Sequence, residues 1–516
     1  MPYRRLALFP LAALLATTLG GSAMLAPAGA ADSTVTISQG VDPVTMDPLK
    51  RTITPTTNVH YNLFDTLVRQ DREGKLIPWV AMSWKRVAPT VWEFKLRKDV
   101  KFWNGDPLTS ADVKFSVEKI KDPPEGSEQG PRVATVDRIE TPDPYTVRYI
   151  TTKPTAMIAG YPWQVFIVDS KFWKEHGDDV GHASNPSYPA EHPMGSGQFV
   201  FKSWRKDEQL VMEANPSSWR GRPALDRVVW KPIPEAAARV AALRTGETDL
   251  ITNVPAQYQL QLAAGRNTQL SSARSIRVLF FAFNTLKPGP QQNKLVRQAL
   301  NYAIDVPAII QTVLGGRAYP ANTPLPPNFV GYDAKIPLYH HDLAKAKALL
   351  AQAGYPDGKG IDMVVNAPIG RYNKDKEIGE AIAGQLNQTG GHFTTKIQEW
   401  TTYVNFTSAR GLTPIYELAW GNNSYDADNT LTSLFTSDAR LSTYANPALD
   451  KLIVDARYET DPKARQAVYD KALAIIHDEA PWLFMFQYED LYATTKRLVW
   501  QARGDENIFC DEMKLR

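Results

Sequence analysis

The sequence is poor in the residues that build metal and redox sites. It has one cysteine, Cys510, and eight histidines among 516 residues. A single cysteine excludes both an internal disulfide and a thiolate cluster, so packing has to stabilise the fold. The one adjacent histidine pair, His340 and His341, is unsuited to chelation because neighbouring side chains point apart on a helix. We therefore expect no metal and no cofactor.

Catalytic motifs are missing as well. The chain has neither the Gly-x-x-x-x-Gly-Lys-Ser/Thr loop that cradles nucleotide phosphates nor the His-Glu-x-x-His pattern of zinc hydrolases. Met194-Gly195-Ser196-Gly197 reads as a tight turn and lacks the strand-to-helix context of a catalytic serine turn. We therefore expect that the protein is not an enzyme.

The first thirty residues have the features of a signal peptide. Arg4 and Arg5 precede an apolar stretch over residues 6–19, and Ala28-Gly29-Ala30 supplies the small residues that signal peptidase reads. The apolar stretch is short for a membrane span, and no cysteine follows the cleavage point to carry a lipid. We predict cleavage of residues 1–30 and a soluble protein exported to the periplasm.

The chain carries little net charge. The formal charge is +3, and two of these positive charges belong to the predicted signal peptide. Proteins that bind nucleic acids concentrate positive charge to displace the counterions of the phosphates. Nucleic acid is therefore excluded as an expected partner.

Strand-like and helix-like patterns alternate along the mature chain, which predicts a mixed α/β fold of two or three domains. Alternating apolar residues predict strands over residues 91–97 and 276–284. A capping-box pattern at Thr109-Ser110-Ala111-Asp112 predicts the start of a helix. Further helices are predicted over 295–303, 342–353 and 374–386, and two more within 447–479, separated at Asp461-Pro462.

A series of blocks along the chain resembles the large solute-binding proteins of oligopeptide, dipeptide and nickel ABC importers, which are family 5 of the extracellular solute-binding proteins. These blocks span nearly all of the mature chain, in the order and spacing of the family. They are Phe64-Asp65-Thr66-Leu67-Val68, the stretches 76–81 and 92–109, Pro193-Met194-Gly195-Ser196-Gly197-Gln198-Phe199, the stretches 222–226, 283–284 and 296–305, Asn446-Pro447-Ala448-Leu449-Asp450, and Ala480-Pro481-Trp482.

The resemblance implies a two-lobed periplasmic-binding-protein fold of class II, cluster C, with an additional inserted domain. Its first lobe would be discontinuous and would comprise residues 31–62, 190–272 and 488–516. The inserted domain would span residues 63–189, and the second lobe would span residues 273–487. The resemblance also implies a ligand held between two closing lobes.

Peptide binders of this family pair the ligand ammonium with an acid three residues after a tryptophan. Here Trp420 is followed at that distance by Asn423, a neutral amide that offers a dipole instead of a charge. Asp426 or Asp428 would then have to reach the amine, or the ligand would present a neutral polar group. The alternative for both aspartates is helix capping or turn formation before Asn429.

Three more side chains are candidate ligand contacts. Arg371 resembles an arginine that dipeptide binders place near the ligand carboxylate, for which a guanidinium fork is suited. Its alternative is a surface position in a loop before a helix. Trp420 and Tyr425 are candidates because aromatic side chains line many solute pockets, and the alternative for both is core packing.

The resemblance implies the substrate-binding component of an ABC importer that captures di- or oligopeptides and delivers them to the membrane permease and its ATPase subunits. An alternative is the same role for another solute, such as an opine, a glutathione-like conjugate, an oligosaccharide or a metal chelate. A second alternative is a peptide-binding chaperone or a sensor. A monomer is expected.

Overall fold

The computed structural model describes residues 33–121, 128–155, 165–176, 188–408 and 413–516. The predicted signal peptide lies outside the described residues. The remainder of the chain, Ser33–Arg516, forms one compact unit. No helix in the described ranges is both long enough and apolar enough to cross a membrane.

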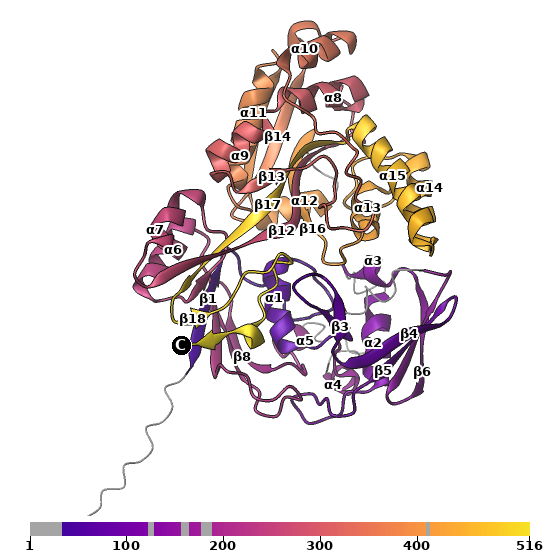
Figure 1. Cartoon of the computed structure of the whole chain (residues 1–516), viewed down its shortest axis with the longest axis vertical. Coiled ribbons are helices and arrows are strands. Elements are labelled where there is room, and N and C mark those ends of the chain that lie inside the picture. The colour runs from indigo at the N-terminus through magenta and orange to yellow at the C-terminus, as the bar shows by residue number, and fades with distance from the viewer. Residues whose placement is uncertain (1–32, 122–127, 156–164, 177–187, 409–412) are drawn as a thin grey trace, which may run out of the picture. The chain divides into compact units, whose positions relative to one another are not determined.

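Eleven strands of the described chain pair into one large sheet. The central pair consists of β12 (Thr268–Phe283) and β17 (Trp482–Thr495), which run antiparallel side by side (Figure 1). On one side of this pair lie β16 (Ile415–Gly421), β14 (Asp362–Ile369) and β15 (His392–Glu399). On the other side lie β11 (Leu250–Ile251), β1 (Thr34–Gln39), β10 (Arg227–Pro232), β9 (Gln209–Ala214) and β8 (Phe199–Arg205), while β13 (Ala318–Pro320) pairs with β17.

Alternation along β12 places helices on both faces of this part of the sheet. Leu279, Phe281 and Phe283 belong to one core, which also contains residues of α8 (Lys294–Ala303), α9 (Val306–Leu314), α10 (Leu343–Gln352), α11 (Asp375–Asn387) and α12 (Trp400–Ser408). Phe280 and Ala282 point to the opposite face. They belong to a second core with residues of α13 (Ala427–Phe435), α14 (Pro447–Tyr458) and α15 (Pro462–Glu479).

A third core joins the two ends of the described chain. It contains Val35 and Ile37 of β1 together with Tyr492, Ile508 and Met513 from the C-terminal segment. The same core includes residues of α1 (Thr54–Leu63), α2 (Ser110–Lys121) and of the antiparallel sheet formed by β4 (Ala81–Ala88), β5 (Val91–Leu96), β7 (Thr146–Thr151) and β6 (Val136–Asp143).

Shorter elements complete the described chain. They are α3 (Gly130–Val133), α4 (Ser170–His176), α5 (Tyr188–Glu191), α6 (Ala236–Thr245) and α7 (Gln259–Ala263), with the strand pairs β2 (Val68–Gln70) with β3 (Leu76–Pro78) and β18 (Leu498–Val499) with β19 (Lys514–Leu515). The lobe and insert boundaries proposed from the sequence stay a prediction.

The locally encoded elements are confirmed. The predicted strand over residues 91–97 is β5, and the strand at 276–284 is the second half of the longer β12. The Asp112 carboxylate accepts a hydrogen bond from the Thr109 backbone at 2.7 Å, as expected of a capping box. The predicted break at residues 461–462 separates α14 from α15, where Asp461 caps the helix by accepting from the amide of Ala464.

Candidate functional site

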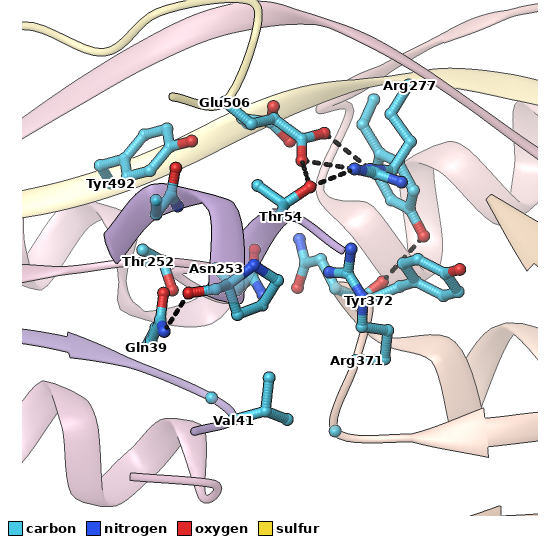
Figure 2. Close-up of a pocket in the computed structure, with 17 residues that line it drawn as sticks. Gln39, Val41, Thr54, Thr252, Asn253, Arg277, Arg371, Tyr372, Tyr492 and Glu506 are labelled. Atoms are coloured by element: carbon cyan, nitrogen blue, oxygen red, sulfur yellow. Dashed lines mark hydrogen bonds and ion pairs between the residues drawn. The ribbon is translucent and has the colours of Figure 1, made fainter. Parts of the chain in front are cut away.

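A small cavity lies where three strands of the large sheet end. It is lined by the end of β1, the start of α1, the segment after β11, the loop after β14, β17 and the C-terminal segment (Figure 2). The lining residues are Gln39, Gly40, Val41, Thr54, Pro55, Asn58, Thr252, Asn253, Arg277, Gly370, Arg371, Tyr372, Asn373, Tyr488, Asp490, Tyr492 and Glu506. Its volume is about 50 Å³. Carboxyl ends of parallel strands are the usual place for ligands in such sheets.

An ion pair forms one wall of the cavity. Nε and Nη2 of Arg277 each donate a hydrogen bond of 2.6 Å to the carboxylate of Glu506. The Ser275 hydroxyl donates to the same carboxylate at 3.0 Å. Burial raises the pKa of Glu506, but Arg277 lowers it more, so that the net shift is downward. Glu506 is therefore an anion that is already neutralised by its partner.

The backbone at Glu506 adopts an unusual conformation. Its φ is +60°, in the left-handed region that costs non-glycine residues energy. Asn253, which also lines the cavity, has a φ of +52°. Strained residues at a cavity rim are typical of binding sites, where the surrounding contacts hold them in place.

The loop that carries Arg371 is fixed by a buried carboxylate. The backbone amides of Arg371 and Tyr372 donate hydrogen bonds to Asp375 at 2.9 Å and 3.0 Å, and Asp375 starts α11. Burial raises the pKa of Asp375 to about 6, although these backbone hydrogen bonds act in the opposite direction. The loop therefore presents the Arg371 side chain from a defined backbone.

The guanidinium of Arg371 forms no direct ion pair with a described residue, although the carboxylates of Glu506 and Asp375 act on it from a longer distance. It points from the loop after β14 into the cavity (Figure 2). Its central carbon lies 4.9 Å from the ring centroid of Tyr372 and 5.6 Å from that of Trp400, and the part of the structure described here gives it no ion pair or side-chain hydrogen bond. Burial lowers the pKa of Arg371, and the neighbouring Arg277 lowers it further. This cation is free to bind a carboxylate through two parallel hydrogen bonds.

Asp490 on β17 is the second acid of the cavity. Its Oδ2 is buried and has no hydrogen-bond partner in the described structure. Burial raises the pKa of Asp490 well above its ordinary value, and the nearby Glu506 raises it further, against the smaller opposing effects of Ser275, Arg277 and Arg371. Asp490 is thus an acid with an unused oxygen at the wall of the cavity.

A larger cleft adjoins the cavity and shares Gly40, Asn253 and Tyr372 with it. Its volume is about 820 Å³, which is within the range for sites that hold small molecules. Trp400 and Tyr258 give it aromatic surface, and its rim carries charges of both signs. Gly40 marks a close approach between the two sides, because a Cβ there would lie 3.1 Å from the carbonyl oxygen of Gly370.

The model of the family described as bacterial extracellular solute-binding proteins, family 5, matches residues 75–441. The chain belongs to this family. Heme-binding protein A of Haemophilus influenzae is 30% identical over 429 residues, covering 79% of this chain and 78% of that protein. Glutathione-binding protein GsiB of Pectobacterium atrosepticum is 26% identical and covers 94% of each.

A solved structure shows the same fold. The ABC transporter-associated periplasmic binding protein DppA of Helicobacter pylori, in complex with the peptide STSA, matches with a TM-score of 0.84 and 26% identity. The match covers 93% of this chain and 98% of that one. The expected two-lobed binding-protein fold is confirmed, and the chain is the solute-binding component of an ABC importer and not an enzyme.

Of the residues that the sequence suggested for this family-5 protein, Arg371 lines the cavity. Tyr425 lines a separate cavity of about 580 Å³ and packs against Phe329, with ring centroids 5.3 Å apart. Trp420 is half-buried in β16, and its buried Nε1 has no hydrogen-bond partner in the described structure. Asn423 forms a side-chain hydrogen bond with Tyr61 of α1. The ligand contacts of these three residues stay predictions.

Both candidate aspartates hold structural ion pairs. Asp426 caps α13 by accepting from the amide of Asp428, and both of its oxygens bind the guanidinium of Arg465. Asp428 is fully buried and accepts a hydrogen bond from Nε of Arg457 at 2.9 Å. Neither residue lines the cavity of Arg371 or its adjoining cleft. Asp426 thus caps α13, as the alternative expected, and a ligand contact of either aspartate stays a prediction.

Sequence reasoning missed three charged residues of the cavity: Arg277, Asp490 and Glu506. Arg277 and Asp490 each stand in a strand whose neighbours are mostly apolar, within stretches 276–284 and 482–493. A lone charge in a buried strand needs a partner or a function, and that signal could have found Arg277. The signal is weaker for Asp490, because Glu489 precedes it. Glu506 lies in an irregular segment and gave no comparable signal.

Proposed function

We propose that this binding protein captures a peptide-like solute that carries a free carboxylate, and that Arg371 binds this carboxylate. The observation that carries the proposal is the unpaired guanidinium at the cavity wall. A half-buried arginine without an ion-pair partner is unfavourable in the empty protein. A ligand carboxylate supplies the missing charge and accepts two parallel hydrogen bonds, so binding removes this cost.

The adjoining cleft supports a ligand larger than the cavity itself. The 50 Å³ cavity has room for only a few atoms, whereas the 820 Å³ cleft beside it can hold several residues of a peptide or a comparable solute. The carboxylate end then lies in the cavity and the remainder of the ligand in the cleft. The periplasmic location and the monomeric state belong to the same proposal.

A non-peptide solute remains the second candidate, because one relative is named for haem and Asn423 replaces the acid expected of peptide binders. The cavity and cleft, as described, are lined by no histidine, cysteine or methionine, which are common axial ligands of haem iron. Opines, glutathione-like conjugates and other solutes with a carboxylate fit the Arg371 site equally well.

Calorimetric titration tests the proposal. The mature protein is unfolded and refolded to remove bound ligand and then titrated with a pool of di- and tripeptides, followed by the same pool with amidated C-termini. We expect binding of the first pool and at least tenfold weaker binding of the second. Equal binding of both pools would contradict the role of Arg371. If neither pool binds, the ligand is not a di- or tripeptide.

Uptake distinguishes transport from the chaperone and sensor alternatives. A strain that lacks this protein should no longer import the ligand found by titration, because the permease receives it from the binding protein. Normal uptake in that strain, with the ligand still bound tightly by the purified protein, would favour a chaperone or a sensor.

A further inference from the structure

The cavity holds an acid and a cation that are both available to a ligand. Arg277 and Glu506 neutralise each other through two short hydrogen bonds. Arg371 and Asp490 remain, one without a direct ion pair and the other with a buried oxygen that has no hydrogen-bond partner in the described structure. The cavity walls therefore offer one hydrogen-bond acceptor, Oδ2 of Asp490, and one cation, the guanidinium of Arg371, to which no described protein group binds directly.

These two groups lie at one small cavity and not at opposite ends of a long groove. The volume of about 50 Å³ leaves room for only a few atoms between the walls. The two ends of an extended peptide are separated by more than 3 Å for each residue, so a peptide of several residues cannot place both ends there. A group that carries ammonium and carboxylate on the same carbon can.

We propose that the cavity binds the α-amino-acid head group of its ligand, with the carboxylate on Arg371 and the ammonium on Asp490. This inference rests on the proposed function and narrows its substrate class. The ligands are amino acids whose side chain is extended, as in γ-glutamyl compounds and other side-chain conjugates, and this extension lies in the adjoining cleft. Asp490 then supplies the carboxylate that pairs with the ligand ammonium, which the neutral amide of Asn423 cannot supply.

Protonation of Asp490 agrees with this arrangement. Burial and the neighbouring Glu506 raise its pKa well above the ordinary value, which favours the neutral form in the empty cavity. The charged groups around it are Arg277, Arg371 and Glu506. An incoming ammonium replaces the proton, so Asp490 becomes charged when its counterion is present. The empty site thus avoids an unpaired anion beside the Arg277–Glu506 pair.

Two isomeric dipeptides test the inference without any mutation. In γ-glutamylglycine the ammonium and a carboxylate share one carbon, whereas in α-glutamylglycine they do not, and the two have equal composition and net charge. We expect refolded wild-type protein to bind the γ isomer at least tenfold more tightly in calorimetry. Equal affinity, or preference for the α isomer, overturns the inference.

Asp490→Asn provides the second test. It should weaken γ-glutamylglycine at least tenfold but change the affinity for glutarylglycine, the same compound without the ammonium, by less than threefold. Equal losses for both compounds overturn the assignment of Asp490. The comparison is made on a variant whose midpoint of urea unfolding matches that of wild type, so that an equal loss for both compounds is not caused by misfolding.

The two proposals fail in different ways. If ordinary peptides bind through their carboxylate and Arg371 but neither isomer is preferred, the head-group inference is wrong and the proposed function stands. If neither the isomers nor the peptide pool bind, both are wrong.

Discussion

Substitution by glutamine at two arginines of the same cavity should change the stability of the ligand-free protein in opposite directions. Arg277 is held by Glu506 through hydrogen bonds of 2.6 Å, whereas Arg371 has two aromatic rings beside it and no carboxylate in direct contact among the described residues. Arg277→Gln leaves the Glu506 carboxylate buried without a counterion, which typically costs about 3–5 kcal/mol. Arg371→Gln removes a cation that has no direct ion pair.

The expected gain for Arg371→Gln follows from two opposing effects. An unpaired charge costs several kcal/mol when it is fully buried and less at the half-buried Arg371, and substitution also relieves repulsion from Arg277. The substitution also removes the cation–π contacts with Tyr372 and Trp400, and each lost contact reduces the gain in stability by roughly 0.5–2 kcal/mol. We therefore expect ligand-free Arg371→Gln to be more stable than wild type by about 1 kcal/mol.

Urea unfolding of ligand-free protein, followed by tryptophan fluorescence, measures both values. Glu208→Gln is a suitable control, because its pair with Arg205 is more than half exposed on both sides and should contribute less than about 1 kcal/mol. A loss of stability in Arg371→Gln as large as that in Arg277→Gln would refute the reasoning, since it would show that Arg371 has a structural partner.

Three further predictions concern other parts of the chain. Burial lowers the pKa of His60 to about 4 in the folded protein. Because the unfolded chain therefore takes up the proton first as the pH falls, the folded protein loses stability between pH 6.5 and 4. The unfolding free energy of wild type, measured relative to His60→Gln, should drop by about 3 kcal/mol from pH 7 to 4. Gly40→Ala should weaken ligand binding in calorimetry by pushing the two sides of the cavity apart, whereas Gly384→Ala, which meets no atom within 4 Å, should leave affinity unchanged. Asp426→Ala should destabilise by about 3–5 kcal/mol, because the Arg465 guanidinium remains buried, without changing affinity; a selective loss of affinity would return Asp426 to the binding site.

The sequence predicts those parts of the fold that are encoded locally. The helices α10 and α15 have an aspartate cap and a periodic apolar face within a dozen or more residues, so the signal lies in one window. The order of the strands in the sheet is not encoded locally. Strand β1 pairs with both β10 and β11, and strand β12 pairs with β17; the paired residues are more than 180 positions apart in each case. No local pattern contains those pairings. Only the resemblance to a known family supplied the overall fold.

The site was less predictable than the fold for a physical reason. Arg277, Asp490 and Glu506 converge from two strands and a C-terminal segment, and their proximity depends on the pairing of β12 with β17. Asp426 looked available for a ligand because its partner Arg465 lies 39 residues further along the chain. A sequence shows that a residue carries charge, but it does not show whether that charge is already neutralised.

The central claim is that Arg371 binds the carboxylate of the ligand, and a thermodynamic cycle tests it most directly. Affinities are measured for the best ligand and its amide, each with wild type and with Arg371→Gln. Removing one partner of a buried charge pair costs roughly 2–5 kcal/mol, so we expect each single change to weaken binding at least thirtyfold. When both changes are combined, the amide with Arg371→Gln should bind little more weakly than either single change alone. If the two losses are independent and simply multiply, the carboxylate binds elsewhere and the account is wrong.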